Sequence, residues 1–405
     1  MPRIYSLSFV TEKIDIYHKD KELDATVRRI ERSDISPRNK ELIFAFQRQC
    51  FADGLGSHRI YQYLNTIPHF AKWIDKDLDK ATKDDIINLV QKFEKMDYSD
   101  WTKMGFKTAL KKFYKWLRDD RDPPEVKWIK TTKRNLGHTL PDDLITESEV
   151  RQLIDTVSHP RDKAIISMLY ESGCRIGEVL SLRIRNAVFD EYGTVLTVTG
   201  KTGSRRVRII SATPYLAAWI NSHPDSKNPE APLWVGIGTR KRNKHIDYPA
   251  VRILITRAAK RAGIKKKIYP HLFRHSRATF LATRLTEAQM NEYFGWAQGS
   301  SMPSTYVHLS GRDVDDALLK MHGLVKDDTK QEAPLKPKDC ERCEERNPAT
   351  SKFCNRCGAP LDIETAIALD DEMSGLDEKL SLLLEDPAVQ EVMIKRMRET
   401  GITSP

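Results

Sequence analysis

One segment of this chain alternates apolar and polar residues, whereas the hydrophobic pattern on either side of it is helical. Residues 187–211 read AVFDEYGTVLTVTGKTGSRRVRIIS and contain glycines at 193, 200 and 203. Alternation predicts strands with one buried face, and the glycines mark turns between them. We therefore predict a three-stranded antiparallel meander with Lys201 at a hairpin. Since apolar residues recur at helical spacing elsewhere, the predicted fold class is mainly α and multidomain, with this one small sheet in an α+β domain.

The charge of the chain is distributed unevenly. The 405 residues carry a net charge of +10, but the segment 361–405 holds eleven acidic and four basic residues and is net −7. The first 360 residues therefore carry +17. A basic body of this size suits a polyanion, because each phosphate contacted by Lys or Arg releases condensed counterions. Charge alone leaves a merely soluble basic surface equally open.

Membrane and export signals are missing from the sequence. The chain has no run of about 18 apolar residues, and the first twenty residues lack the apolar core of a signal peptide. We therefore expect no membrane partner and a cytoplasmic location.

Five side chains in four well-separated segments carry the groups that phosphoryl transfer needs. They are Arg175, Lys201, His271, Arg274 and Tyr306. Guanidinium groups fit phosphate oxygens in a bidentate manner, an imidazole moves protons near neutral pH, and a tyrosine can hold a phosphate covalently. The sequence contains no motif typical of a nucleotide or catalytic-metal site. The set predicts that the protein breaks and rejoins DNA strands, with no cofactor for catalysis.

The segments around these residues resemble the catalytic domain of the tyrosine recombinases, also called the lambda-integrase family. The resemblance runs from about 146 to 324, in SGCRIGEVLSLRI, TGKTGSRRVRI, PHLFRHSRATFLA, YFGW and STYVH. The order and spacing of these five segments make it specific. In one departure, Trp296 stands where the family usually has a histidine. Its indole N–H can donate to a phosphate oxygen but cannot act as an acid or a base.

The resemblance implies a catalytic set and a mechanism. Tyr306 attacks the scissile phosphate and forms a 3′-phosphotyrosyl link, while the two arginines and the indole N–H stabilise the pentavalent phosphate. His271 assists as a base and Lys201 protonates the leaving 5′ oxygen, without ATP or a catalytic metal. The implied catalytic residues are Arg175, Lys201, His271, Arg274, Trp296 and Tyr306.

The resemblance also implies partners. These are double-stranded DNA at specific attachment sites, a homo-tetramer in synapsis and accessory DNA-bending proteins, with the protein associated with the nucleoid. The enzyme would be the integrase of a mobile element, or a resolvase of chromosome dimers or plasmids.

Two other functions stay open at this stage. One is a catalytically degenerate DNA-binding regulator on the same fold, against which the complete set of active-site residues argues. The other is a type IB topoisomerase-like strand relaxase, which the order and spacing of the segments disfavour. Individually, Arg175 can pair with Glu178 as a structural arginine, and Lys201 can be a solvated turn lysine whose role passes to Arg205 or Arg206.

A basic amphipathic helix is predicted within 101–120, with Phe106 and Phe113 on its apolar face. It belongs to a helical unit that either clamps DNA or binds a protein partner. A proline-bounded basic linker follows, and the hairpin adds further arginines. The predicted DNA-binding residues are Lys103, Lys107, Lys111, Lys115, Lys133, Arg134 and Arg205.

Two CxxC pairs separated by ten residues predict a metal site. Cys340, Cys343, Cys354 and Cys357 can aim four thiolates at one ion and form a closed tetrahedral site, so we predict structural zinc in a small ribbon. Disulfides are the less favoured alternative in a chain without a secretion signal. The ribbon would contact DNA or dock a protein.

The last segment is acidic and amphipathic. Its apolar stripe would pack on a neighbouring protomer, cover the basic site, or dock on its own chain. The predicted organisation is a helical core-binding (DNA-clamp) domain at 1–121, a linker at 122–145, the catalytic domain at 146–325, a linker at 326–338, the zinc ribbon at 339–361 and the acidic helical tail at 362–405.

Overall fold

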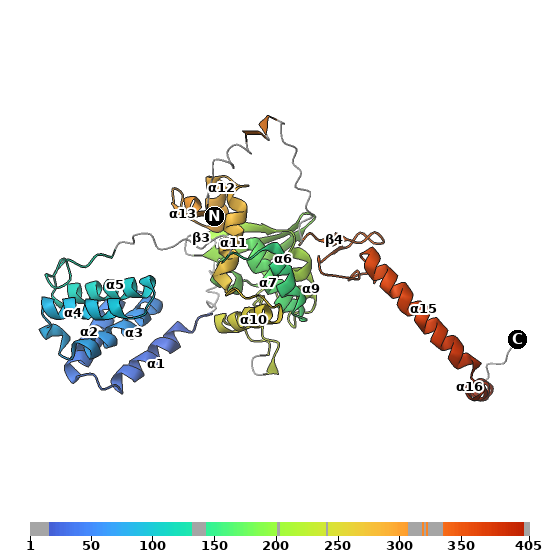
Figure 1. Cartoon of the computed structure of the whole chain (residues 1–405), viewed down its shortest axis with the longest axis horizontal. Coiled ribbons are helices and arrows are strands. Elements are labelled where there is room, and N and C mark those ends of the chain that lie inside the picture. The colour runs from blue at the N-terminus through green and yellow to red at the C-terminus, as the bar shows by residue number, and fades with distance from the viewer. Residues whose placement is uncertain are drawn as a thin grey trace, which may run out of the picture. The chain divides into compact units, whose positions relative to one another are not determined.

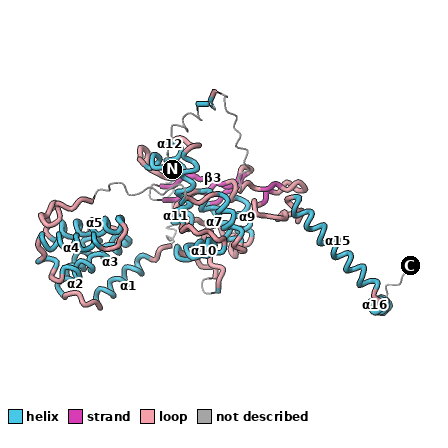
Figure 2. Tube along the Cα trace, viewed as in Figure 1, coloured by secondary structure: helices cyan, strands magenta, loops and turns pink. Residues whose placement is uncertain are grey.

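The computed structural model describes residues 16–131, 143–200, 203–239, 242–306, 318–319, 321–322 and 335–400. The chain divides into two compact units, 1–140 and 141–405. Helices dominate both units, and the strands are confined to one meander and one short hairpin (Figure 2). The predicted fold class, mainly α with a small antiparallel sheet, is confirmed. Within the part of the chain that is described, every helix is too short or too polar to cross a membrane.

The first unit is a bundle of helices around an aromatic core. Phe46 packs edge-on against Phe113, with ring centroids 5.3 Å apart, and Phe93, also fully buried, belongs to the same core. At the start of one helix, Thr82 and Asp85 form the reciprocal capping box that satisfies two free N–H groups. The elements are α1 Lys19–Glu31, α2 Pro37–Ala52, α3 Ser57–Ile74, η1 Leu78–Lys80, α4 Lys83–Lys95 and α5 Asp100–Leu117.

The second unit surrounds the predicted meander with helices. Its elements before the cysteine cluster are α6 Glu147–Asp155, α7 Pro160–Ser172, α8 Ile176–Leu180, η3 Ile184–Asn186, β1 Ala187–Asp190, β2 Gly193–Gly200, β3 Gly203–Ile209, α9 Thr213–Asn221, α10 Tyr248–Arg261, α11 Pro270–Ala282, α12 Glu287–Phe294 and α13 Met302–Tyr306. In Figure 1 the sheet lies between α12 on one side and α6, α7 and α9 on the other. The helix expected around 313–321 falls mostly outside the described residues.

The meander has the order β1-β2-β3 and is antiparallel throughout, as predicted. Leu196 pairs with Val207 in its centre, and Gly200 pairs with Gly203 at its tip. Alternate residues of β3 are buried, which is the half-buried pattern that the sequence indicated. Lys201 and Thr202 connect the two glycines and lie outside the described residues. The register of β2 and β3 therefore shows that the hairpin carrying Lys201 leaves the sheet at Gly200 and returns at Gly203.

The start of α9 is held by a buried carboxylate from α7. Nine consecutive residues at the end of α7 are buried, and Glu171 is one of them. Its carboxylate accepts hydrogen bonds from the backbone N–H groups of Ile210, Ser211 and Ala212, at 2.6–3.0 Å. A carboxylate fits this position because several converging N–H groups stabilise its charge. The contact ties the end of the meander to the central helix.

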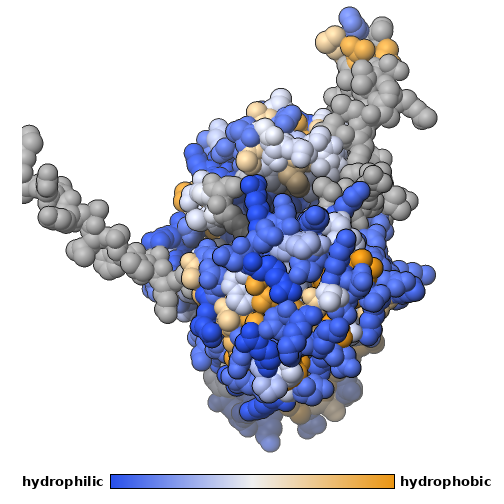
Figure 3. Space-filling model, turned by 90° about the vertical axis from the view of Figure 1, so that its left-hand side faces the viewer, coloured by the Kyte–Doolittle hydropathy of each residue, from blue (hydrophilic) through white to orange (hydrophobic). Residues whose placement is uncertain are grey.

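The cysteine ribbon and the tail complete the second unit. The ribbon contains β4 Lys338–Asp339 and β5 Arg346–Asn347, and it meets α9 where Thr350 hydrogen-bonds the hydroxyl of Tyr215. The tail consists of α15 Ile363–Glu385 and α16 Pro387–Glu399. A helical tail was predicted there, and it is divided into two helices: Asp386 ends α15 and caps α16, because Pro387 has no N–H to continue the first helix. The face of the molecule in Figure 3 is mainly hydrophilic, with apolar residues in small separate patches.

We expect Glu171→Ala to destabilise the second unit by at least about 2 kcal/mol, because buried N–H groups lose their acceptor. Urea unfolding followed by tryptophan fluorescence measures the change. Glu191→Ala, at an exposed glutamate in the same unit, is the control and should change the free energy of unfolding by less than about 0.5 kcal/mol. Equal stability of the two variants would contradict the role given to Glu171.

Candidate active site

A buried glutamate organises one side of the candidate site. Glu178 in α8 is only 4% exposed and accepts hydrogen bonds from two arginines. Arg175 donates through Nη1 to Oε1 at 2.9 Å, and its backbone N–H donates to Oε2 at 3.0 Å. Arg205, from β3, donates to both carboxylate oxygens at 3.2 and 2.8 Å. Burial raises the pKa of the Glu178 carboxyl, but Arg205 and then Arg175 outweigh burial and hold the pKa below its ordinary value. The glutamate is therefore ionised.

Two glycines let the neighbouring backbone approach this cluster. A Cβ atom on Gly200 would lie 2.4 Å from Oε1 of Glu178. A Cβ atom on Gly295 would lie 2.7 Å from Nη1 of Arg205, and Gly295 also has a φ of +61°. Both positions thus require glycine for space, and the second also for its backbone conformation. Because Gly200 directly precedes Lys201, the hairpin leaves the sheet beside Glu178.

Arg205 is a correction to the sequence prediction. We predicted that it binds DNA, but its side chain is buried and its donors are used inside the protein. Besides Glu178, it donates through Nε to the carbonyl of Tyr293 at 2.9 Å. Because both Nη atoms of Arg205 are paired with the buried carboxylate of Glu178, its charge is already neutralised inside the protein, and the structure contradicts the prediction that it binds DNA. It positions Glu178, and through Glu178 it positions Arg175, whose side chain is 36% exposed.

Arg274, in α11, is the second arginine of the site. It is 2% exposed and donates to the carbonyls of Gly173 at 3.0 Å and of Phe294 at 2.8 Å. Its guanidinium also lies over the rings of Phe294 and Trp296, with its carbon 5.0 and 5.4 Å from their centroids. Burial, followed by the charge of Arg175, lowers the pKa of Arg274 to about 10. It therefore keeps its charge at neutral pH.

Tyr306, at the end of α13, lies in a tight aromatic pocket. Its ring stacks on Trp296 with centroids 5.6 Å apart and planes 4° from parallel. The side chain is only 8% exposed, and its hydroxyl is 2.7 Å from Nδ1 of His275. Burial raises the pKa of Tyr306, and the charge of Arg274 opposes this effect. The tyrosine hydroxyl is therefore protonated at neutral pH.

His275 was missed by the sequence reasoning. It sits directly after Arg274 and four residues after His271, so all three share one side of α11. That spacing was the available signal. His271 itself is exposed and meets the ring of His275 edge-on, with centroids 4.5 Å apart. Lost hydration, followed by the charges of His275, Arg274 and Arg175, lowers the pKa of His271 to about 4.

The structure thus brings five of the six predicted catalytic residues into one chain of contacts. Glu178 is hydrogen-bonded to Arg175, and the carbonyl of Gly173, beside Cys174, accepts a hydrogen bond from Arg274. Helix α11 carries Arg274 and the two histidines, of which His275 contacts Tyr306. Lys201 lies outside the described residues, although its hairpin ends beside this cluster. The six predicted residues were Arg175, Lys201, His271, Arg274, Trp296 and Tyr306.

The lysines predicted on α5 contact acceptors of their own unit. Lys103 donates to the carbonyl of Glu94, and Lys107 pairs with the Glu94 carboxylate at 2.6 Å. Lys111 donates to the carbonyl of Ile129, and Lys115 lies 3.5 Å from Asp122. These side chains are partly buried rather than a free basic face, so their binding to DNA stays a prediction. Lys133 and Arg134 lie outside the described residues.

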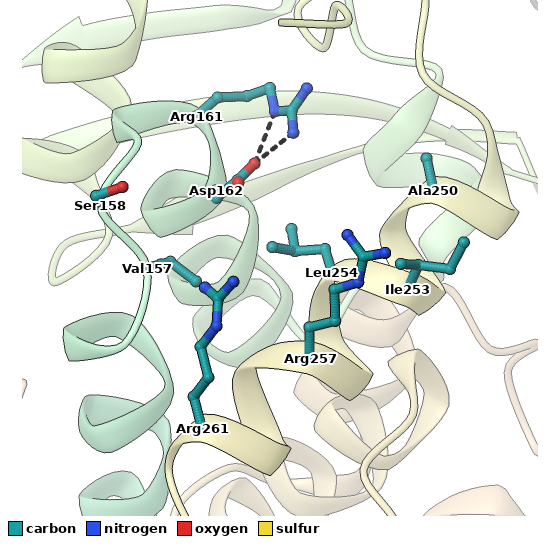
Figure 4. Close-up of a pocket in the computed structure, with 9 residues that line it drawn as sticks. All are labelled: Val157, Ser158, Arg161, Asp162, Ala250, Ile253, Leu254, Arg257 and Arg261. Carbon is teal, nitrogen blue, oxygen red and sulfur yellow. Dashed lines mark hydrogen bonds and ion pairs between the residues drawn. The ribbon is translucent and has the colours of Figure 1, made fainter. Parts of the chain in front are cut away.

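A separate pocket of about 220 Å³ lies between α10 and the turn that joins α6 to α7 (Figure 4). Arg257 and Arg261 border it from α10, while Arg161 pairs with Asp162 on the other side at 2.5 Å. Apolar residues such as Ile253 complete its wall. None of the predicted catalytic residues that the structure describes lines this pocket.

Comparisons with known proteins agree with this geometry. Residues 143–312 match the phage integrase family. Tyrosine recombinase XerA of Pyrococcus horikoshii is 27% identical over 260 residues, which cover 63% of this chain and 87% of the relative. Transposase A from transposon Tn554 of Staphylococcus aureus is 27% identical over 264 residues, which cover 60% of this chain and 70% of the relative. Residues 143–312 therefore form a domain of the phage integrase family, and the relatives that match the chain include tyrosine recombinases.

Solved structures of tyrosine recombinases share the fold. XerH site-specific recombinase bound to palindromic difH substrate has a TM-score of 0.53 and 17% identity, and the match covers 75% of this chain and 95% of XerH. A lambda integrase dimer bound to a COC′ core site has a TM-score of 0.52 and 14% identity, over 71% of this chain and 85% of that one. The predicted enzyme class, a tyrosine-type site-specific DNA recombinase, is confirmed, and the regulator and topoisomerase alternatives are not favoured.

The four clustered cysteines of this recombinase form a candidate metal centre after the family match ends. Their Sγ atoms all lie within 4.8 Å of one another, and the pairs Cys340–Cys357 and Cys343–Cys354 are 3.6 Å apart. Metal–sulfur bonds of about 2.3 Å at tetrahedral angles require roughly 3.8 Å between sulfurs. The geometry therefore fits a single ion, and all six cysteines of the chain are free of disulfides.

The backbone around the cluster also suits thiolates. Glu344 and Gly358 each follow the second cysteine of a pair and take a positive φ, which closes both turns in the same way. The backbone N–H of Arg356 and the side-chain amide of Asn347 donate to Sγ of Cys354, at 3.4 and 3.6 Å. Such donors stabilise a negatively charged sulfur ligand.

We expect Arg205→Ala to cost about 3–5 kcal/mol of stability, because it leaves Glu178 as a buried charge without its main partner. DNA cleavage should fall with it, since Arg175 loses its support. Arg206→Ala changes the adjacent, exposed arginine of the same strand and serves as the control. Thermal unfolding and cleavage of both variants test this, and an Arg205→Ala variant as stable and active as the control would contradict it.

Proposed function

We propose that this recombinase cuts one DNA strand with Tyr306 and conserves the bond energy in a 3′-phosphotyrosyl link. The phenol oxygen attacks the scissile phosphorus, the bond to the 5′ oxygen breaks, and a 5′-hydroxyl leaves. The 5′-hydroxyl of a partner strand then attacks the same phosphorus and releases the tyrosine. The observation that carries the proposal is the placement of a buried tyrosine hydroxyl beside an imidazole and the Arg274–Trp296 stack.

Phosphate binding is assigned to the two arginines and Trp296. Arg175 commits one Nη to Glu178 and is partly exposed, so its remaining N–H groups can donate to a phosphate. Arg274 uses one hydrogen on each of two Nη atoms and keeps others available. Trp296 adds its indole N–H. Fixed donors of this kind stabilise the charge that develops on the pentavalent phosphate.

Lys201 and His271 are assigned to proton transfer. Lys201 protonates the leaving 5′ oxygen, which is consistent with a hairpin that ends beside Glu178 and Arg175. The low pKa of His271 follows in part from the charges of the arginines. A bound phosphate offsets these charges and raises that pKa, which strengthens His271 in its assigned role as the base that assists the attack.

The substrate is assigned as double-stranded DNA at specific attachment sites, cut and joined within a homo-tetramer and assisted by DNA-bending proteins. The DNA-bound state of the XerH and lambda integrase structures supports the DNA partner. The helical unit, residues 1–121, is assigned as the core-binding domain, joined by a linker at 122–145 to a catalytic domain at 146–325. A cytoplasmic, nucleoid-associated location follows from this substrate.

Zinc is assigned to the cysteine cluster, where a closed set of four sulfur ligands suits a structural ion. Zinc would fold the ribbon at 339–361, which follows a linker at 326–338 and precedes the acidic tail at 362–405. It takes no part in the reaction, which needs no metal in this mechanism.

We expect Tyr306→Phe to abolish covalent capture of DNA and leave DNA binding within about twofold of the wild type. Nicked duplexes that carry candidate attachment sites trap the adduct, and a denaturing gel in EDTA shows it. Trp296→Phe retains stacking without the N–H and should lower capture by about tenfold to a hundredfold. An adduct formed by Tyr306→Phe would contradict the assignment.

We expect one zinc ion per chain by elemental analysis, and a loss of that ion in Cys343→Ser. Cys50→Ser changes a buried cysteine outside the cluster and should keep the zinc. This test does not depend on recombinase activity, because it measures only the metal content of the protein. Equal zinc in the two variants, or no zinc in the wild type, would contradict the proposed centre.

A further inference from the structure

The hydrogen bond between Tyr306 and His275 connects the nucleophile to an imidazole that no assignment above uses. Nδ1 of His275 lies 2.7 Å from the phenol oxygen, a short distance for such a bond. The two rings come from α13 and α11, and their centroids are 5.7 Å apart. A general base must lie within about 2.6–3.2 Å of the proton that it takes, and His275 meets this condition.

The pocket around Tyr306 restricts other proton acceptors. The tyrosine is 8% exposed and is held flat against Trp296 by stacking. Indole cannot accept a proton, and the neighbouring Arg274 is a cation. Water has little access to a side chain this deeply buried. Among the residues that the structure describes, the imidazole of His275 is thus the basic group in contact with the hydroxyl.

His275 is neutral at neutral pH, as a proton acceptor must be. Burial, followed by the charge of Arg274, lowers its pKa below the ordinary value for histidine. For Nδ1 to accept the hydrogen bond of the phenol, the neutral ring must carry its own proton on Nε2. The titratable and charged groups that face it among the described residues are His271 and Arg274 from its own helix and Tyr306 from α13. None of these groups is a carboxylate, which would stabilise the protonated ring.

We propose that His275 is the catalytic base that accepts the phenolic proton of Tyr306. As the phenol oxygen forms its bond to phosphorus, the proton moves to Nδ1, and the bond to the 5′ oxygen breaks with its electron pair on that oxygen. During rejoining the 5′-hydroxyl attacks, and the leaving phenolate takes the proton back from the imidazolium. This inference rests on the proposed function and refines it, since it moves the base from His271 to His275.

DNA binding strengthens this base at the time when it is needed. A phosphate held by Arg274 offsets the positive charge that lowers the pKa of His275. The imidazolium formed by proton transfer is then favoured by the nearby phosphate. Without DNA, the same arginine lowers the basicity of the imidazole beside the tyrosine.

The test compares two variants of His275 in the full-length protein. His275→Asn keeps a polar group near the hydroxyl but cannot accept a proton at neutral pH, and His275→Ala removes the contact. We expect covalent capture on the nicked duplex to slow by about a hundredfold in both variants. In the wild type the rate should fall as the pH drops through the pKa of His275, and this acid limb should disappear in the variants.

Chemical rescue separates proton transfer from simple packing. A 3,5-difluorotyrosine at position 306 ionises more readily, so it should restore capture by His275→Asn at least about tenfold and change the wild type little. A substrate with a 5′-bridging sulfur needs no acid for its leaving group, so it should rescue Lys201→Ala and leave the His275 variants slow.

Several outcomes would overturn the inference. Wild-type or faster capture by His275→Ala would mean that the contact only restrains the tyrosine. A slow variant that keeps the acid limb and is not rescued by the fluorinated tyrosine would mean a packing role. Tyr306→Phe in the same assay keeps the two claims apart. If it still forms the adduct, the proposed function fails; if it is inactive while His275→Ala is fully active, only the base assignment fails.

Discussion

The buried charge of Glu178 is the constraint on which the catalytic half of this recombinase depends. A carboxylate out of water must be paired, and here Arg205 pairs with it on both oxygens. That pairing fixes β3 against α8, and it requires glycine at 200 and 295, where the backbone approaches most closely. Arg175 is then directed by the same carboxylate while part of its guanidinium stays accessible. A structural ion pair thus positions the arginine that we propose to bind phosphate, and also the end of the strand from which the hairpin of Lys201 begins.

The nucleophile depends on a different set of contacts. Helix α11 presents His271, Arg274 and His275 on one side, and the tyrosine meets this side through stacking and one hydrogen bond. Arg274 joins the two halves, because its donors reach the carbonyls of Gly173 and Phe294. The positive charges that prepare the site for a phosphate also lower the basicity of both histidines. We therefore expect the negative charge of a bound phosphate to balance these positive charges and to restore the basicity of the histidines.

The sequence was sufficient for the features that local rules control. Alternation and glycine spacing predicted the meander around Lys201, and paired cysteines predicted their own cluster. The sequence was not sufficient for features that depend on which side chains the tertiary structure buries. Arg205 looks like an exposed hairpin arginine until its register turns it inward onto Glu178. The contact of His275 with Tyr306 could not be predicted, because the two residues are 31 positions apart and only the tertiary structure places α13 against α11. The break at Pro387 was a local signal that the helical pattern obscured.

The most direct measurement is the identification of the amino acid that carries the DNA. The adduct from a nicked duplex, trimmed with nuclease and digested with trypsin, yields a nucleotide-bearing peptide for tandem mass spectrometry. The peptide 285–312 contains both Tyr293 and Tyr306, so its fragments distinguish them. Our account predicts a nucleotide 3′-phosphate on Tyr306, because this hydroxyl contacts His275 whereas that of Tyr293 donates to the carbonyl of Glu171. A nucleotide on Tyr293 or on any other residue would contradict it.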